Sequence, residues 1–318
     1  MIAQQYSAAN PSRSNSPYCI FLAASIQHNW DYAAKGMRIT IESCRISNPH
    51  IPIAVIIDDD SLAVRELFKG CEIIIIDPAE LKLGLRTDLG IGVYFIFYVH
   101  LLSHYQKVLY VDGDTLIFGD LTPLFEMDGH LLARRFDRNL SVEYVNPEII
   151  MQKEGVPIST DCINTGVVLF DMEYWSNGKL HQEFLSLTAE YGWNSFKNPD
   201  QGFLNIICWR NAIKEKLPDI YNTFISEIEK SSSHYTKVSE TGILFPCVSN
   251  VDIKIMHFIG PIKPWHFAIQ GYSLQRISYR YYEQFLPWHT RISQHLLVYP
   301  NFIWRKLSSL LNKNSSPV

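Results

Sequence analysis

Two aspartates separated by one glycine, Asp112-Gly113-Asp114, form the most distinctive acidic group in the sequence. They follow directly after the apolar run KVLYV at 107–111, which predicts a buried strand. A turn at that point places both carboxylates at the carboxyl edge of a sheet, and the glycine lets a ligand approach the backbone. Such a pair repels unless a cation lies between its members. Hard oxygen ligands favour Mg²⁺ or Mn²⁺, and either ion can bridge a departing diphosphate. Acidic turns are often only solvated, so this motif needs support from other residues.

A second segment, HFIGPIKPW at 257–265, supplies that support. It follows a predicted strand at 253–258 and combines an imidazole, a glycine and a lysine at close spacing. His257 could add a nitrogen ligand to the metal, Gly260 would let backbone N–H groups approach phosphates, and Lys263 would place a positive charge on them. Without the acidic pair, the same segment would be interpreted as a proline-rich turn with a buried histidine and a surface lysine.

Two further motifs carry groups that suit a sugar. Asn164 and Thr165 in CINTGVVLFD are expected just before a strand, where their amide and hydroxyl groups could bind sugar hydroxyls. Asp200 and Gln201 in NPDQGFLN begin a predicted helix. Asp200 could be a first-turn carboxylate favoured by the helix dipole, or it could face the anomeric carbon or a sugar hydroxyl.

The elements that must position these residues alternate between strands and helices. Strands are predicted at 18–25, 51–57, 71–76, 107–111, 130–135, 163–171 and 253–258, and helices at 32–47, 61–69, 91–104, 172–191 and 200–210. Continuous apolar strands alternating with helices are typical of a doubly wound, mostly parallel sheet that is covered on both faces. Ligands bind such sheets at the carboxyl ends of the strands, so the turns after 25, 57 and 76 should converge on one crevice.

The composition narrows the class of protein. In 318 residues, 47% are hydrophobic and 19% charged, which is ordinary for a globular chain and ample for a core. The net charge of −4 gives no general attraction to nucleic acid, so we expect no nucleic-acid partner. Six scattered cysteines without a CxxC pair indicate reduced core residues. With a polar start and no long apolar stretch, the sequence predicts neither a signal peptide nor a transmembrane helix, and hence a cytoplasmic protein.

The motifs DGD, NTGV, DQGFLN and HFIGPIKPW, in this order, resemble those of the glycogenin-like retaining glycosyltransferases of family 8, which include bacterial lipopolysaccharide galactosyl- and glucosyltransferases. The resemblance extends over about residues 18–267. It implies the GT-A fold, in which a Rossmann-like, mostly parallel open sheet carries helices on both faces. It further implies a UDP-sugar donor, Mn²⁺ with Mg²⁺ as the alternative, and retention of the anomeric configuration.

The resemblance also assigns roles residue by residue. The implied metal ligands are Asp112, Asp114 and His257. The implied donor contacts are Ala24, Ser25, Tyr32, Asp112, Gly113, Asn164, Thr165, Gly260 and Lys263. Asp200 and Gln201 match residues at the reaction centre. We expect substitution on one face of the sugar, with Asp200 stabilising the positive charge that develops on it.

One position departs from the family pattern. Family members usually carry a basic residue about sixteen positions before the first aspartate of DxD, and here Ile96 lies near that place. Arg86 in the preceding loop could substitute for it. The departure motivates an alternative function, a non-catalytic nucleotide-sugar or glycan-binding protein on the same fold. A metal-dependent phosphohydrolase is disfavoured, because it would need a nucleophilic aspartate or more metal ligands.

The chain is expected to divide into a flexible N-terminus (1–17), a catalytic domain (18–268) and a C-terminal helical segment (269–318). From 270 onward, six basic residues and many aromatic ones accompany a single glutamate. Such a segment could lie on an anionic membrane face, or it could pack as an appendage on the catalytic domain. We expect an external acceptor, a glycan or a lipid-linked saccharide, in the assembly of bacterial surface polysaccharide or lipooligosaccharide.

Overall fold

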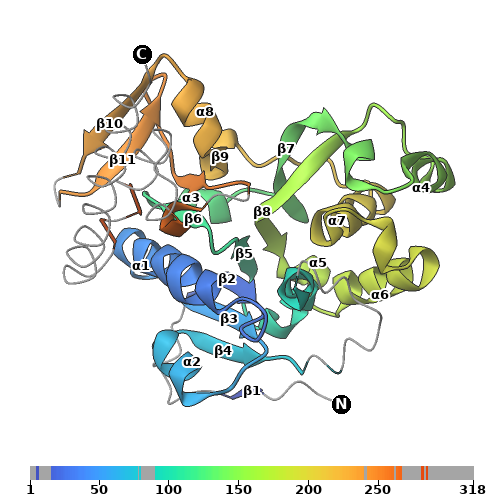
Figure 1. Ribbon diagram of the computed structural model, residues 1–318, viewed down its shortest axis with the longest axis horizontal. Coiled ribbons are helices and arrows are strands. Elements are labelled where there is room, and N and C mark those ends of the chain that lie inside the picture. Colours follow the sequence, from blue (N-terminus) through green and yellow to red (C-terminus); the bar gives the residue numbers. More distant parts are fainter. Residues whose placement is uncertain are drawn as a thin grey trace, which may run out of the picture. The chain divides into compact units, whose positions relative to one another are not determined.

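The computed structural model describes residues 5–6, 16–77, 79, 90–239, 242–260, 263–266, 281–282 and 284–285 (Figure 1). The chain forms two compact units. The first comprises Met1–Thr223 and Ile253–His257, and the second comprises Phe224–Asp252 and Phe258–Val318. The expected boundaries at 17 and 268 stay predictions, and most of the segment from 269 onward lies outside the described residues.

A seven-stranded sheet in the order β1-β4-β3-β2-β5-β8-β7 forms the centre of the first unit. Its strands are β1 (Gln5–Tyr6), β2 (Tyr18–Ala24), β3 (Ile53–Ile57), β4 (Glu72–Ile75), β5 (Lys107–Val111), β7 (Leu131–Asn139) and β8 (Asp161–Asp171). Strands β4, β3, β2 and β5 pair in parallel, whereas β1 and β8 run antiparallel to their neighbours. The expected mostly parallel α/β sheet is confirmed.

Helices cover both faces of this sheet. One face packs against η1 (Tyr32–Met37), α1 (Arg38–Ser47), α2 (Leu62–Leu67) and α3 (Thr122–Phe125). The other packs against η4 (Ile91–Leu102), η5 (Leu140–Glu143), α4 (Pro147–Glu154), α5 (Met172–Trp175), α6 (Lys179–Tyr191) and α7 (Pro199–Arg210) (Figure 1). Alternate residues of β2 point to opposite faces: Phe21 packs in the core on the α7 side, and Leu22 packs in the core on the α1 side. Burial on both sides explains why these strands are continuous apolar runs.

Three predicted elements differ from the structure. The helix expected at 172–191 is two helices, because Gly178 adopts φ 77° between α5 and α6. The segment expected as an ordinary helix at 91–104 is the 3₁₀ helix η4. Strand β8 begins at Asp161, since its pairing with β7 extends back to that residue. Asn164 and Thr165 lie inside the strand, in the predicted range 163–171 as well as in the observed one, so the expectation that they precede it was wrong.

The direction in which successive strands are added to the sheet changes between β4 and β5. After β2 the chain adds β3 and β4 on one side, and β5 then returns to the other side of β2. The carboxyl ends of β2 and β5 thus flank a topological switch point, where open α/β sheets bind their ligands. Directly after β5, strand β6 (Thr115–Ile117) pairs antiparallel with β13 (Ile255–His257). This pairing joins two segments that lie far apart in the sequence.

The second unit contains a small antiparallel sheet of β10 (His234–Val238), β11 (Leu244–Val248) and β12 (Val251–Asp252). Helix α8 (Ile225–Lys230) precedes it and the 3₁₀ turn η8 (Pro264–His266) follows it. Strand β9 (Thr223–Phe224) lies at the boundary between the units, and η7 (Asp219–Tyr221) lies just before β9.

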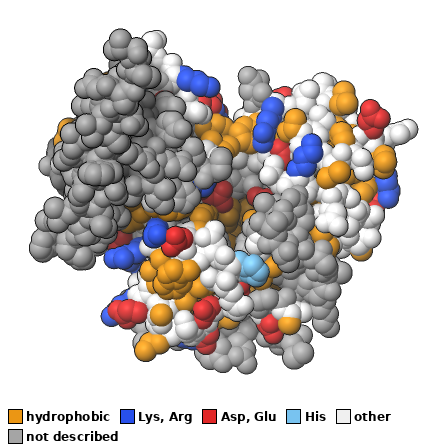
Figure 2. All heavy atoms as spheres, in the orientation of Figure 1, with side chains coloured by type: hydrophobic (Ala, Val, Ile, Leu, Met, Phe, Trp, Pro, Cys, Tyr) orange, Lys and Arg blue, Asp and Glu red, His pale blue; other side chains and the backbone are white. Residues whose placement is uncertain are grey.

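In the part of the chain that the structure describes, no helix has the length and apolar character needed to span a bilayer. Basic and acidic side chains lie interspersed on the described surface in Figure 2.

Candidate active site

Asp112, Asp114 and His257 form an acidic cluster at the switch point. Both aspartates lie on the turn between β5 and β6, and the pairing of Thr115 with His257 brings the imidazole beside them. His257 Nε2 lies 3.6 Å from Asp112 Oδ2 and 3.4 Å from Asp114 Oδ1. One ligand atom from each residue lies within 4.8 Å of the others, which suits a single cation. Two carboxylates fit Mn²⁺ or Mg²⁺, and the imidazole favours Mn²⁺, because Mg²⁺ prefers an all-oxygen shell.

Asn222 orients the histidine of this cluster. Its Oδ1 lies 3.0 Å from His257 Nδ1, and its Nδ2 donates to Asn164 Oδ1 at 2.8 Å. An amide oxygen can only accept, so His257 carries a proton on Nδ1, and Nε2 is the ring nitrogen that faces the aspartates and could bind a cation. Arg134 Nη1 donates to the Asn222 carbonyl at 2.6 Å and fixes the backbone there. No motif in the sequence singles out Asn222.

Charge repulsion is built into the cluster. Burial and the neighbouring Asp114 raise the pKa of Asp112 to about 7, while His257 and a hydrogen bond from Tyr110 act in the opposite direction. The Tyr110 hydroxyl donates to Asp112 Oδ1 at 2.7 Å. The side chain of Asp112 is 28% exposed and that of Asp114 6%, so the cluster opens on the Asp112 side. A divalent cation would relieve the repulsion that raises this pKa.

Two glycines permit the close packing around the aspartates. A Cβ on Gly166 of β8 would overlap the His257 ring and lie 2.9 Å from Asp112 Oδ2. A Cβ on Gly113 would lie 2.9 Å from Tyr32 Cζ, and the Gly113 N–H donates to the Tyr32 hydroxyl at 2.6 Å. The space beside Gly113 is therefore filled by helix η1. Packing against Tyr32 is therefore the structural reason for a glycine at position 113. The expectation that Gly113 lets a ligand approach the backbone stays a prediction.

Asp200, Gln201, Asn164 and Thr165 form a second group beside the cluster. The Thr165 hydroxyl donates to Asp200 Oδ2 at 2.6 Å, and Asn164 Nδ2 donates to Gln201 Oε1 at 3.1 Å. Burial raises the pKa of Asp200, and the hydrogen bond from Thr165 opposes that shift. Since Asn164 also accepts from Asn222, one hydrogen-bonded network connects the first turn of α7 with the histidine of the cluster.

The turn after β2 is held by Asp58, a residue that sequence reasoning missed. Ser25 Oγ donates to Asp58 Oδ2 at 2.5 Å, and the Ile26 N–H donates to Asp58 Oδ1 at 2.7 Å. Ala24 and Ser25 are both buried at the switch point. The only signal for Asp58 was its place in the acidic turn after a strand. It fixes the shape of the segment that carries Ala24 and Ser25, two of the expected donor contacts.

Comparison with known protein families decides the class of this site. The model of glycosyl transferase family 8 matches residues 48–268, which is more than half of the chain. The chain belongs to glycosyl transferase family 8. The expected enzyme class, a glycosyltransferase, is thereby confirmed at the level of the family.

Similar proteins agree with this family 8 assignment. Glycogenin-1 from Caenorhabditis elegans is 23% identical over 286 residues, covering 85% of this chain and 57% of that protein. Lipopolysaccharide 1,2-glucosyltransferase from Escherichia coli (strain K12) is 27% identical over 167 residues, covering 51% of this chain and 44% of that protein. The chain spans about half the length of the curated relatives it matches.

Solved structures show the shared fold. The galactosyltransferase LgtC, crystallised with donor and acceptor sugar analogs, has a TM-score of 0.54 at 20% identity, covering 86% of this chain and 99% of that one. The glycosyltransferase GlyE from Streptococcus pneumoniae TIGR4 has a TM-score of 0.56 at 18% identity, covering 92% of this chain and 64% of that one. The expected GT-A architecture is confirmed.

Gly260 and Lys263 of this family 8 chain belong to the second unit. Gly260 adopts φ 103°, in the left-handed region that favours glycine. Lys263 Nζ donates to the Phe258 carbonyl at 3.0 Å. The diphosphate contacts expected for both residues stay predictions.

Ile96 is a core residue. It is 1% exposed on η4, within the apolar cluster that covers one face of the sheet. A basic side chain there would lose its hydration, so an apolar residue is what this helix position requires. Arg86 lies outside the described residues.

Proposed function

We propose that this chain transfers a hexosyl group from a UDP-sugar to a saccharide acceptor, with retention of the anomeric configuration. The observation that carries the proposal is the Asp112, Asp114 and His257 cluster at the switch point of the sheet, in a chain of family 8. The orienting hydrogen bond from His257 to Asn222 supports it, because outer partners of this kind are characteristic of histidines that bind metal.

The cluster is proposed to hold Mn²⁺, with Mg²⁺ as the alternative. When bound, such an ion neutralises charge on a departing diphosphate. The uracil and ribose would lie in the turn of Ala24 and Ser25, beside Tyr32. Gly260 and Lys263 would contact the diphosphate. These positions come from the family resemblance and from the place of the β2 turn at the switch point.

Asp200 is the proposed stabiliser of the reaction centre. Its carboxylate is held by Thr165, and Gln201 beside it is held by Asn164, so both side chains are oriented before a sugar arrives. An ionised Asp200 would stabilise an oxocarbenium-like sugar as the bond to UDP breaks. The acceptor hydroxyl would attack the same face, and its proton would pass to the departing phosphate oxygen.

The acceptor is proposed to be a glycan or a lipid-linked saccharide of bacterial surface assembly. The similarity to a lipopolysaccharide 1,2-glucosyltransferase and to a galactosyltransferase solved with an acceptor sugar analog supports an external saccharide. The basic and aromatic segment from 270 onward supports work at the inner face of a membrane from the cytoplasm.

Release of UDP and the configuration of the product test the proposal together. The purified chain is incubated with UDP-glucose, UDP-galactose, UDP-glucuronate and UDP-N-acetylhexosamines, with Mn²⁺ and with or without lipooligosaccharide acceptor. The expected result is UDP release from one donor and an α-configured product by proton NMR. A β-configured product would refute retention. Donor binding without release under any of these conditions would favour the non-catalytic binding protein.

A further inference from the structure

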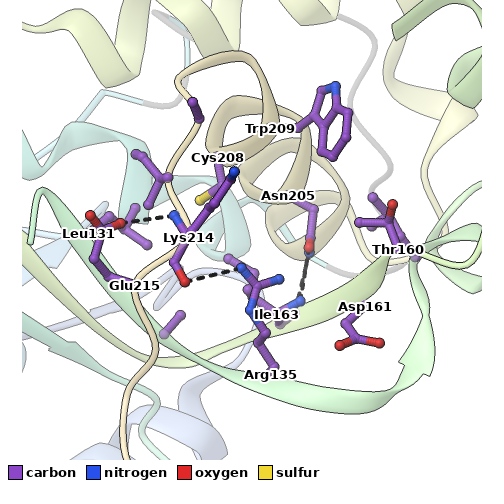
Figure 3. A pocket seen from close by; sticks show the side chains of 14 residues that line it. Leu131, Arg135, Thr160, Asp161, Ile163, Asn205, Cys208, Trp209, Lys214 and Glu215 are labelled. Carbon is purple, nitrogen blue, oxygen red and sulfur yellow. Dashed lines mark hydrogen bonds between the residues drawn. The ribbon is translucent and has the colours of Figure 1, made fainter. Parts of the chain in front are cut away.

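A cavity of about 430 Å³ lies in the first unit on the face of the sheet that α7 covers. Figure 3 shows its walls: Asn205 and Trp209 come from α7, Arg135 from β7 and Asp161 from β8, and the segment after α7 carries Lys214. None of the expected site residues lines it. Its volume is within the usual range for small-molecule pockets.

The lining divides into an apolar floor and a charged rim. The floor is formed by Leu131, Ala133, Leu140, Ile163, Cys208 and Ile213, all of which are buried. Arg135 and Lys214 contribute positive charge to the rim, and Asp161 and Glu215 contribute negative charge. Because the two signs balance, the rim does not select an anion such as a phosphate. An acyl chain would bury these charged groups without compensation, so the lining disfavours it as well.

Trp209 gives the pocket a flat aromatic wall. Trp209 is 40% exposed, although tryptophan is highly buried on average. The indole Nε1 donates to the Glu154 carbonyl at 3.1 Å, and Arg210 next to it is bonded to the Glu154 carboxylate at 2.8 Å. The ring is therefore oriented before any ligand binds. An exposed aromatic face beside hydrogen-bonding groups suits a ligand with an apolar face and polar edges.

The polar groups around the pocket offer both donors and acceptors. Arg135 Nη2 donates to the Lys214 carbonyl at 3.4 Å, a long bond, and the Lys214 N–H donates to the Glu215 carboxylate at 2.9 Å. Asn205 is committed to the backbone, since its Oδ1 accepts from the Ile163 N–H at 2.9 Å (Figure 3). Asp161 is exposed at the mouth. Guanidinium and carboxylate groups at such an edge match the hydroxyls of a sugar ring.

We propose that this pocket binds one or two residues of a neutral oligosaccharide, with a sugar ring stacked on Trp209 and its hydroxyls bonded to Arg135 and Asp161. The site is distinct from the reaction centre, because its lining includes none of Asp112, Asp114, His257, Asp200 and Gln201. In the transfer reaction, the pocket would hold a part of the acceptor glycan that is remote from the reacting hydroxyl. This role rests on the proposed function.

Binding of neutral oligosaccharides tests the pocket without any transfer reaction. Lactose, maltotriose, cellotriose and diacetylchitobiose are titrated into the full chain with EDTA and no donor, and followed by saturation-transfer NMR and calorimetry. At least one should bind, and Trp209→Ala should weaken that binding by about tenfold. Trp209→Phe, which keeps a smaller ring, should bind the sugar with an affinity between those of the unchanged chain and Trp209→Ala. Asp161→Asn should bind the sugar more weakly than the unchanged chain. UDP with Mn²⁺ should not displace the sugar.

Leu185→Ala is the matched control, because Leu185 is 39% exposed on α6 and does not line the cavity. It should bind the oligosaccharide as the unchanged chain does. Leu185→Ala should also release UDP from a donor at the normal rate. The proposal would be refuted if none of the four sugars bound, or if their binding did not depend on Trp209. Binding of decanoate in place of the sugars would also refute it. Absence of UDP release with Trp209-dependent sugar binding would instead refute the proposed function alone.

Discussion

Replacement of Asn222 by alanine is predicted to weaken metal binding at a site that the substitution does not touch directly. Asn222 is fully buried and accepts the proton of His257 Nδ1 at 3.0 Å. Without it, the imidazole can rotate or change tautomer, and Nε2 no longer presents a fixed lone pair to the cation. Loss of such an outer partner typically costs about 10- to 100-fold in metal affinity. This corresponds to roughly 1.4–2.7 kcal/mol of binding free energy.

The substitution also affects folding. It removes the hydrogen bond to Asn164 and leaves a buried imidazole N–H without its acceptor, at a cost of about 1–3 kcal/mol. Metal binding and stability are therefore measured separately. Electron paramagnetic resonance of free Mn²⁺ gives the affinity, and urea unfolding with EDTA gives the free energy of unfolding.

Asn222→Asp is the informative companion, because a carboxylate still accepts from His257. It should retain Mn²⁺ affinity at or above the normal level, since a carboxylate raises the basicity of the ligating imidazole. A folded Asn222→Ala chain that binds Mn²⁺ with unchanged affinity would refute the orienting role. The same conclusion would follow if both variants lost affinity equally.

Three further substitutions test other parts of the account. Asp200→Asn should slow sugar transfer by about 100-fold or more while donor affinity, measured by calorimetry, stays within a few-fold, because charge stabilisation is needed only as the bond breaks; unchanged turnover would contradict this. Ala212 ends α7 with φ 53°, so Ala212→Gly should raise the free energy of unfolding by about 1 kcal/mol in urea titrations, and a loss of stability would contradict this. Burial lowers the pKa of His181 to about 4, so the unfolded chain binds its proton at higher pH than the folded chain. Stability should therefore fall as pH drops from about 6.5 toward 4, and His181→Phe should reduce that fall in urea unfolding at pH 7 and pH 5.

The strands and the acidic turn could be predicted because their signals are local. Burial on both faces makes β2, β3 and β5 continuous apolar runs, and the aspartates follow β5 immediately. The pairing of β6 with β13 was not predictable from three-residue strands. The residue types in HFIGPIKPW and the family resemblance both pointed to His257 as a ligand, but neither showed how it reaches the aspartates.

Asn222 and Asp58 escaped prediction for a related reason. Each acts through side-chain hydrogen bonds to residues about 30 or more positions away, to His257 and Asn164 in one case and to Ser25 in the other. Neither has a local pattern that separates it from an ordinary polar loop residue. The break at Gly178 was likewise hidden, because the residues on both sides of it have helical spacing.

Metal-dependent binding of UDP tests the central claim most directly. Calorimetric titration of UDP is compared with Mn²⁺ and with EDTA, for the unchanged chain, for Asp114→Ala and for Asp128→Ala, whose exposed carboxylate lies before β7 as a matched control. We predict tight binding only with Mn²⁺, retained by Asp128→Ala and lost by Asp114→Ala. Equal UDP binding with Mn²⁺ and EDTA, or normal metal-dependent binding by Asp114→Ala, would contradict the assignment of this cluster as the metal site of a UDP-sugar transferase.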